Sequence, residues 1–76
     1  MSKVVLVTNY DDWEGVYVDG TLINEGHQIL REEFVLILKE AGTFDYSIEE
    51  AGEWLYDWGS LPDSYEKFLE LNEESE

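Results

Sequence analysis

The chain has 76 residues, of which nineteen are Asp or Glu and only four are Lys or Arg, so its formal net charge is −15. A surface of this sign repels nucleic acid and anionic membranes and attracts basic proteins, which excludes direct binding to the first two. The chain also has three Trp, five Tyr, three Phe and no Cys, so it should fold around an apolar core without disulfides or thiolate metal sites.

The N-terminal segment predicts a buried strand. Val4–Val7 is a short β-branched run, typical of a strand covered on both faces. The segment from Met1 to Val7 is too short for a signal peptide, and no apolar stretch approaches the length of a membrane span. We therefore expect a cytoplasmic protein with no membrane partner.

A β-hairpin is expected next, after a loop over residues 10–15. Asp19-Gly20 separates the β-prone runs Val16–Val18 and Thr21–Ile23, and this dipeptide favours a two-residue turn in which both residues have positive φ. The register that follows places Val18 opposite Thr21, Tyr17 opposite Leu22 and Val16 opposite Ile23.

From Gln28 to Ala41 the spacing of apolar residues predicts a helix that ends at Gly42. Ile29 and Leu36 lie off its main apolar stripe, so either the stripe is wide or a second patch faces a partner. The expected stripe consists of Leu30, Phe34, Ile37, Leu38 and Ala41.

The C-terminal half predicts shorter elements. Phe44, Tyr46 and Ile48 alternate as in a strand, whereas residues 53–58 fit either a strand or a short helical turn ended by Gly59, which we favour. Residues 60–63 resemble a capping box with Pro62 in the first turn of a last short helix. Its expected apolar face consists of Tyr65, Phe68 and Leu69.

Together these elements predict one α+β domain over residues 1–71, followed by an acidic, frayed tail over residues 72–76. The expected architecture is an antiparallel meander of three to four strands, packed by one main helix, with a short helical C-terminal segment.

Catalytic chemistry finds little support in the sequence. His27 is the single histidine and has no evident nucleophile or orienting partner, so we expect a structural role for it. Asp11, Asp12 and Glu14, with Asp19 nearby, do not match a calcium-loop spacing. We therefore expect no enzyme, no metal site and no cofactor.

The charge is concentrated in the second half of the chain. Residues 1–39 have seven acidic and three basic side chains, whereas residues 40–76 have twelve and one. Carboxylates alternating with aromatic residues can imitate the phosphates of a nucleic acid and occupy the basic groove of a protein that binds one. Alternatively, the aromatic residues belong to the core, the acids are a solvated face, or the charge reflects a halophilic origin. The predicted contact residues are Glu49, Glu50, Glu53, Trp54, Tyr56, Asp57, Trp58 and Asp63.

An alternative interface is apolar. Ile29, Val35 and Leu36 could form a patch through which the chain acts as an adaptor or inhibitor, or pairs as a homodimer. The sequence leaves open whether the protein is a monomer or a homodimer.

Two motifs resemble small, uncharacterised acidic proteins of tailed bacteriophages. The first is Trp-x-Gly-x-Tyr-x-Asp-Gly over residues 13–20, with Glu25-Gly26-His27 after it, and the second is Trp-Gly-x-Leu-Pro over residues 58–62. The resemblance implies an accessory phage product that acts in the bacterial cytoplasm, where such proteins are often inhibitors of host enzymes or antiviral defence, including CRISPR effectors. It supplies no catalytic residue and implies that Trp13, Gly15, Tyr17, Asp19 and Gly20 determine the fold.

Overall fold

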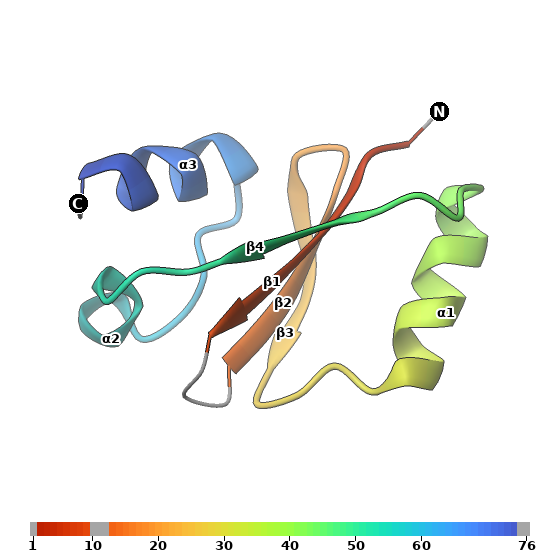
Figure 1. Cartoon of the computed structure of the whole chain (residues 1–76), viewed down its shortest axis with the longest axis horizontal. Helices are drawn as coiled ribbons and strands as arrows, with labels where there is room; N and C mark the ends of the chain where they lie inside the picture. Colours follow the sequence, from red (N-terminus) through yellow and green to blue (C-terminus); the bar gives the residue numbers. More distant parts are fainter. Residues whose placement is uncertain (1, 10–12, 75–76) are drawn as a thin grey trace.

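The computed structural model describes residues 2–9 and 13–74, which form a four-stranded sheet and three helices (Figure 1). The strand order in the sheet is β3-β2-β1-β4. The predicted α+β class is therefore confirmed. The elements in chain order are β1 (Val4–Asn9), β2 (Trp13–Val18), β3 (Thr21–Gly26), α1 (Arg31–Ala41), β4 (Ser47–Glu50), α2 (Trp54–Trp58) and α3 (Tyr65–Glu74).

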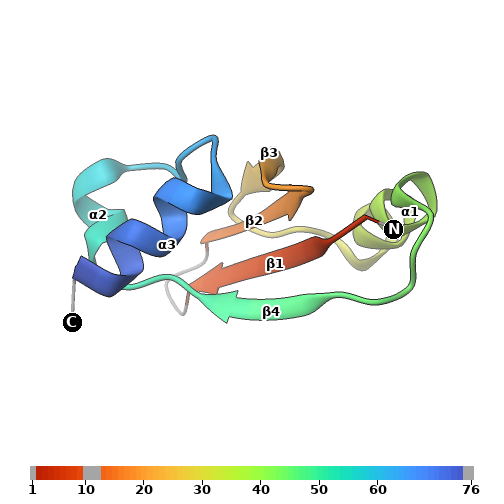
Figure 2. The same cartoon turned by 90° about the horizontal axis from the view of Figure 1, so that it is seen from above.

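The sheet lies between two helical layers, with α1 on one side and α2 and α3 on the other (Figures 1 and 2). Because side chains alternate along a strand, β1 contributes to both layers. Val5 and Val7 pack with Phe68 of α3, whereas Val4 packs with Leu38 of α1. The continuous apolar run of β1 is therefore buried on both faces, as predicted.

The hairpin between β2 and β3 has the predicted turn and most of the predicted register. Asp19 and Gly20 have φ of 51° and 87°, and Val18 pairs with Thr21 and Tyr17 with Leu22. Val16 pairs with Asn24, not with Ile23, because the register shifts between Val16 and Tyr17. The expected Val16–Ile23 pair is therefore wrong. Strand β2 also begins at Trp13, so part of the expected loop is strand, while residues 10–12 lie outside the described residues.

Of Phe44, Tyr46 and Ile48, whose alternation predicted a strand, only Ile48 lies in one, because β4 begins at Ser47; this strand pairs with β1 in parallel. The chain reaches it from β3 through α1, which crosses one face of the sheet. A crossover of this kind is what a parallel pair requires, since a tight hairpin joins only antiparallel strands. The sheet is therefore an antiparallel meander of three strands with a parallel fourth strand.

Helix α1 begins at Arg31, three residues later than expected, and ends as predicted at Gly42, which has φ of 75°. Residues 28–30 stay outside the helix: Leu30 has an extended backbone with φ of −64° and ψ of 147°, and the Ile29 N–H donates to the Glu14 carboxylate at 2.8 Å. Ile29 is consequently buried beside Leu38, whereas Leu30, expected on the apolar stripe, is half exposed.

Residues 60–64 run across the edge of the hairpin and do not begin a helix. The Tyr17 hydroxyl donates to the backbone oxygen of Pro62, and the Leu22 N–H donates to the backbone oxygen of Asp63 at 2.8 Å. Helix α3 starts at Tyr65, and the Ser64 hydroxyl accepts from the Lys67 N–H at 3.4 Å. The capping box expected over residues 60–63 is therefore wrong, because tertiary hydrogen bonds hold these residues extended.

Helix α3 continues through Glu74, so residues 72–74 are helical and do not belong to a frayed tail. Asn72 explains this. Its Oδ1 accepts from the Trp54 Nε1 at 2.6 Å and the Gly52 N–H at 3.0 Å, and its Nδ2 donates to the Glu50 backbone oxygen at 3.0 Å. Residues 75–76 lie outside the described residues, and no helix in the described part of the chain could span a membrane.

Candidate binding surfaces

The predicted contact residues come from β4, α2 and the segments beside α2 and before α3, and most of them are exposed. Tyr56, Asp57 and Trp58 are exposed on α2, whereas Trp54 is only 8% exposed and packs edge-to-face against Phe68. Trp54 therefore belongs to the core and cannot contact a partner directly. The acids Glu50, Glu53 and Asp63 are exposed, and Glu49 is partly buried.

Helix α3 adds four carboxylates that the predicted site lacked. Glu66, Glu70 and Glu73 recur at positions i, i+4 and i+7, which places them on one side of the helix, with Glu74 beside them. Phe68 points the opposite way, into the core. We name the combined surface the acidic face. It consists of Glu49, Glu50, Glu53, Asp57, Asp63, Glu66, Glu70, Glu73 and Glu74.

Internal ion pairs neutralise little of this charge. Over residues 2–9 and 13–74 the structure has one ion pair, in which Lys67 Nζ lies 3.6 Å from Glu70 Oε2 on the surface of α3. An exposed pair of this kind contributes about 0–1 kcal/mol. Lys3 lies over the ring of Tyr65, 5.3 Å from its centre. The carboxylates of the acidic face are therefore largely available to an external cation.

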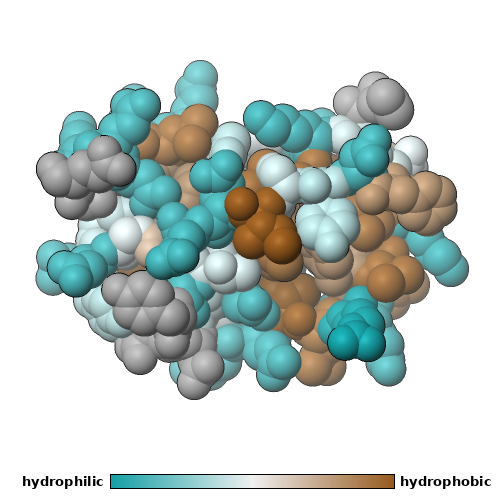
Figure 3. Space-filling view, in the orientation of Figure 1, coloured by the Kyte–Doolittle hydropathy of each residue, from teal (hydrophilic) through white to brown (hydrophobic). Residues whose placement is uncertain are grey.

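An apolar surface lies over β4 and α1, where hydrophobic side chains gather on the face of the molecule seen in Figure 3. Phe44 is 84% exposed and Ile48 60% exposed. Val35 and Leu36 of the expected dimer patch are also exposed, but Ile29 is buried in the core and does not belong to the patch. We define the apolar surface as Phe44, Tyr46 and Ile48. Leu36 does not belong to it, because Leu36 lies two helical positions from Phe34, which packs against Tyr46.

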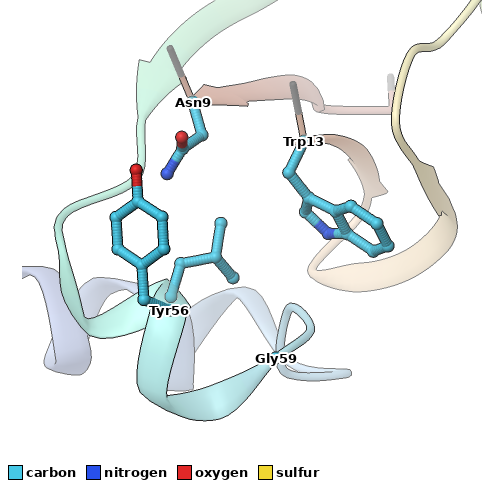
Figure 4. A pocket seen from close by; sticks show the side chains of 5 residues that line it. Asn9, Trp13, Tyr56 and Gly59 are labelled. Atoms are coloured by element: carbon cyan, nitrogen blue, oxygen red, sulfur yellow. The ribbon is translucent and has the colours of Figure 1, made fainter. Parts of the chain in front are cut away.

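A cavity of about 200 Å³ lies where the end of β1 and the start of β2 approach α2 (Figure 4). Trp13 and Tyr56 stand on opposite sides of it, and the side chain of Asn9 points between them. Among the described residues, Leu55 and Gly59 also line it. The indole N–H of Trp13 donates to Glu25 at 3.3 Å, and the same carboxylate accepts from the Leu61 N–H at 2.9 Å. These bonds fix the Trp13 ring at the mouth of what we name the Trp13–Tyr56 cavity.

His27 lies near a second, more polar cavity, of about 430 Å³, lined by Asn9, Glu14, His27 and Gln28. The His27 ring contacts Trp13 edge-to-face at 5.2 Å between ring centres. Among the described residues no group of three His, Cys, Asp or Glu side chains could hold a metal ion. Asp11 and Asp12, considered above as oxygen ligands, lie outside those residues.

The residues with shifted pKa values are Tyr17 and Asp19 of the β2–β3 hairpin and Tyr65 of α3, which packs against Tyr17. Burial, followed by the nearby charges of Glu25 and Asp63, raises the pKa of Tyr17 above its ordinary value. Burial also raises the pKa of Tyr65, with a smaller contribution from Glu49. The backbone N–H of Lys3 donates to Asp19 at 2.8 Å and lowers the pKa of that carboxyl. Burial therefore accounts for the largest part of both tyrosine shifts, and a backbone hydrogen bond accounts for the largest part of the Asp19 shift.

The two motifs meet in the structure. Gly15 lies against the side chain of Leu61, and Tyr17 bonds to Pro62, so the second motif packs on the first. Comparison with protein-family models, curated proteins and solved structures finds no significant match to this chain. The likeness to bacteriophage proteins therefore stays an expectation from the motifs.

Proposed function

We propose that this protein is a non-enzymatic inhibitor of the kind made by bacteriophages, and that it binds a basic, nucleic-acid-handling protein of the bacterial host or of its antiviral defence. A nuclease or a CRISPR effector in the cytoplasm would have the required surface. The observation that supports the proposal is the acidic face, where nine carboxylates accompany one lysine and internal ion pairs are nearly absent among the described residues.

The physical argument concerns where the charge lies. The carboxylates of α3 follow one side of the helix. Glu49 of β4 lies near Tyr65 of α3, whose pKa it helps to raise, and α2 belongs to the same helical layer (Figure 1). A row of fixed negative charges can occupy Arg and Lys side chains that otherwise contact phosphates, and the long-range field accelerates association. Exposed Tyr56 and Trp58 supply aromatic area within this face, as the anchors of protein interfaces commonly do.

The test uses two variants that each remove four negative charges. The first carries Glu49→Gln, Glu50→Gln, Glu53→Gln and Asp57→Asn on the acidic face. The second, matched control carries the same types of change on the α1 side of the sheet, at exposed Glu32, Glu33, Glu40 and Asp45. Both are used, with the natural chain, to capture partners from bacterial lysate at about 50 mM and about 500 mM NaCl.

The proposal expects nucleic-acid-binding proteins to be captured at low salt by the natural chain and the control, and to be released at high salt. The first variant should bind the captured protein about 10-fold or more weakly, because it lacks charges that contact the partner. Equal loss in both variants would mean that only net charge matters. Capture that is indifferent to salt and to both sets of changes would contradict charge mimicry.

The apolar surface supports a second candidate function, an adaptor or inhibitor that acts through hydrophobic contact, including as a homodimer. The exposure of Phe44 and Ile48 favours it, because large exposed apolar patches mark interfaces. A dimer joined along β4 would, however, bring Glu49 and Glu50 of two copies together. Sedimentation at two protein concentrations distinguishes a monomeric adaptor or inhibitor from a homodimer, since a monomer at both concentrations excludes the homodimer.

A further inference from the structure

The Trp13–Tyr56 cavity has a chemistry of its own. None of its five described lining residues is charged, its walls are two aromatic rings, and the amide of Asn9 points between them (Figure 4). Its volume of about 200 Å³ is below the range of about 300–1,000 Å³ typical of sites for cofactors and drug-sized ligands. It is large enough for the end of one long side chain.

The electrostatic setting of the cavity favours a cation. The Glu25 carboxylate accepts from the Trp13 indole N–H at 3.3 Å, and exposed Asp57 follows Tyr56 in α2. The chain as a whole carries a net charge of −15. An anion would be repelled from this position, whereas the faces of Trp and Tyr rings attract cations directly.

We propose that the Trp13–Tyr56 cavity receives one cationic side chain, a Lys ammonium or an Arg guanidinium, of the basic partner. This inference rests on the proposed function and deepens it by naming the partner group that is recognised. The two rings contact the cation and its aliphatic stem, and the Asn9 amide supplies a polar group beside it. The acidic face then provides long-range attraction, and the cavity provides a local contact with defined geometry.

The experiment uses small probes and no partner. N-acetyl-arginine amide, N-acetyl-lysine amide and the uncharged N-acetyl-norleucine amide are titrated into ¹⁵N-labelled protein at about 150 mM NaCl. The indole N–H signal of Trp13, assigned with Trp13→Phe, reports on the cavity. We expect that signal to move with at least one cationic probe, which binds about 3- to 10-fold more tightly than norleucine amide. The tighter of the two cations names the side chain.

A pair of tyrosine variants distinguishes binding in the cavity from nonspecific attraction of a cation to an acidic surface. Tyr56 and Tyr46 are exposed to a similar degree, 54% and 49%, but only Tyr56 lines the cavity. Tyr56→Ala should weaken binding of the cationic probe about 3-fold or more, and Tyr46→Ala should leave it unchanged.

Two results would overturn the proposal. One is equal affinity for norleucine amide and both cationic probes, which would make the cavity an apolar site. The other is an equal effect of Tyr56→Ala and Tyr46→Ala. Either failure would leave the proposed function standing if the four-site variant on the acidic face still lost its partner, so the two proposals fail independently.

Discussion

Gly15 is the residue at which one added methyl group should matter most. A Cβ there would overlap the side chain of buried Leu61 and lie 3.3 Å from the backbone oxygen of Asn24. We expect Gly15→Ala to lower the free energy of unfolding by about 1–3 kcal/mol, because Leu61 must repack. Gly26→Ala is the matched control, since a Cβ at Gly26 would meet nothing within 4 Å. Urea unfolding of both variants measures the difference, and an equally stable Gly15→Ala protein would contradict the packing described.

Tyr17 should set the alkaline limit of stability. Burial raises its pKa in the folded protein, so its contribution is fully present below about pH 10, where an unfolded tyrosine ionises, and is lost as the pH rises further. Tyr17→Phe removes both this titration and the hydrogen bond to Pro62. We expect a loss of about 0.5–1.5 kcal/mol at pH 7, together with a flatter decline above pH 10. Denaturant unfolding from pH 7 to 11 tests this, and an unchanged alkaline slope would rule it out.

Residue patterns predicted the site only in part. Trp54 and Trp58 are four residues apart, and this spacing does not tell which of them faces the core. The bond from the Trp54 indole to Asn72 decides it, and that contact joins residues eighteen positions apart. The carboxylates of α3 were predictable, since Glu66, Glu70 and Glu73 show helical spacing opposite Phe68.

Among the elements, α3 is tied to α2 and to the end of β4 through Asn72. Its side chain bonds to Gly52, Trp54 and Glu50, so removing it leaves the indole N–H and a backbone N–H without this acceptor. We expect Asn72→Ala to lower the free energy of unfolding by about 1–3 kcal/mol and to shift the Trp54 indole signal. Glu73→Ala, at an exposed neighbour in the same helix, should change neither. An unshifted Trp54 signal in Asn72→Ala would contradict this role.

At the scale of elements, the sequence predicted the features that depend on neighbouring residues alone. Asp19-Gly20 and Gly42 placed a turn and a helix end, because each position has positive φ. The shift that displaces Ile23 depends on how β3 meets β2, and the parallel pairing of β4 depends on a crossover, so neither was visible in the spacing of apolar residues. Residues 60–63 have a sequence typical of a helix cap, but hydrogen bonds to the hairpin, which is distant in sequence, hold them outside the helix.

For the whole molecule, self-repulsion should make stability depend on salt. The net charge is −15, and the described residues contain one ion pair. Screening by NaCl should therefore stabilise the fold by about 1 kcal/mol or more between about 20 mM and 500 mM, which corresponds to a rise in Tm of about 4–8 °C. Both four-site variants should show a smaller rise. A Tm that does not change with NaCl would mean that the carboxylates are neutralised by contacts other than those described.

Charged and apolar surface residues are also distributed unevenly over the molecule. The carboxylates of α2 and α3 lie on one side of the sheet, whereas the apolar surface lies over β4 and α1 (Figure 3). Tyr56 and Trp58 are exposed within the acidic face, and Glu50 shares a side of β4 with Ile48. A partner of the α2 and α3 carboxylates and a partner of the apolar surface would therefore approach different sides of the same molecule. Charge variants on the two sides of the sheet can distinguish these approaches.

The most direct test of the central claim is competition with nucleic acid. A captured partner is loaded with a labelled duplex, and the natural chain, the four-site variant of the acidic face and the matched control are titrated against it at one salt concentration. The account predicts that the natural chain and the control displace the duplex competitively, and that the acidic-face variant needs about 10-fold more protein. A ternary complex of partner, duplex and this protein, or equal displacement by all three chains, would contradict it.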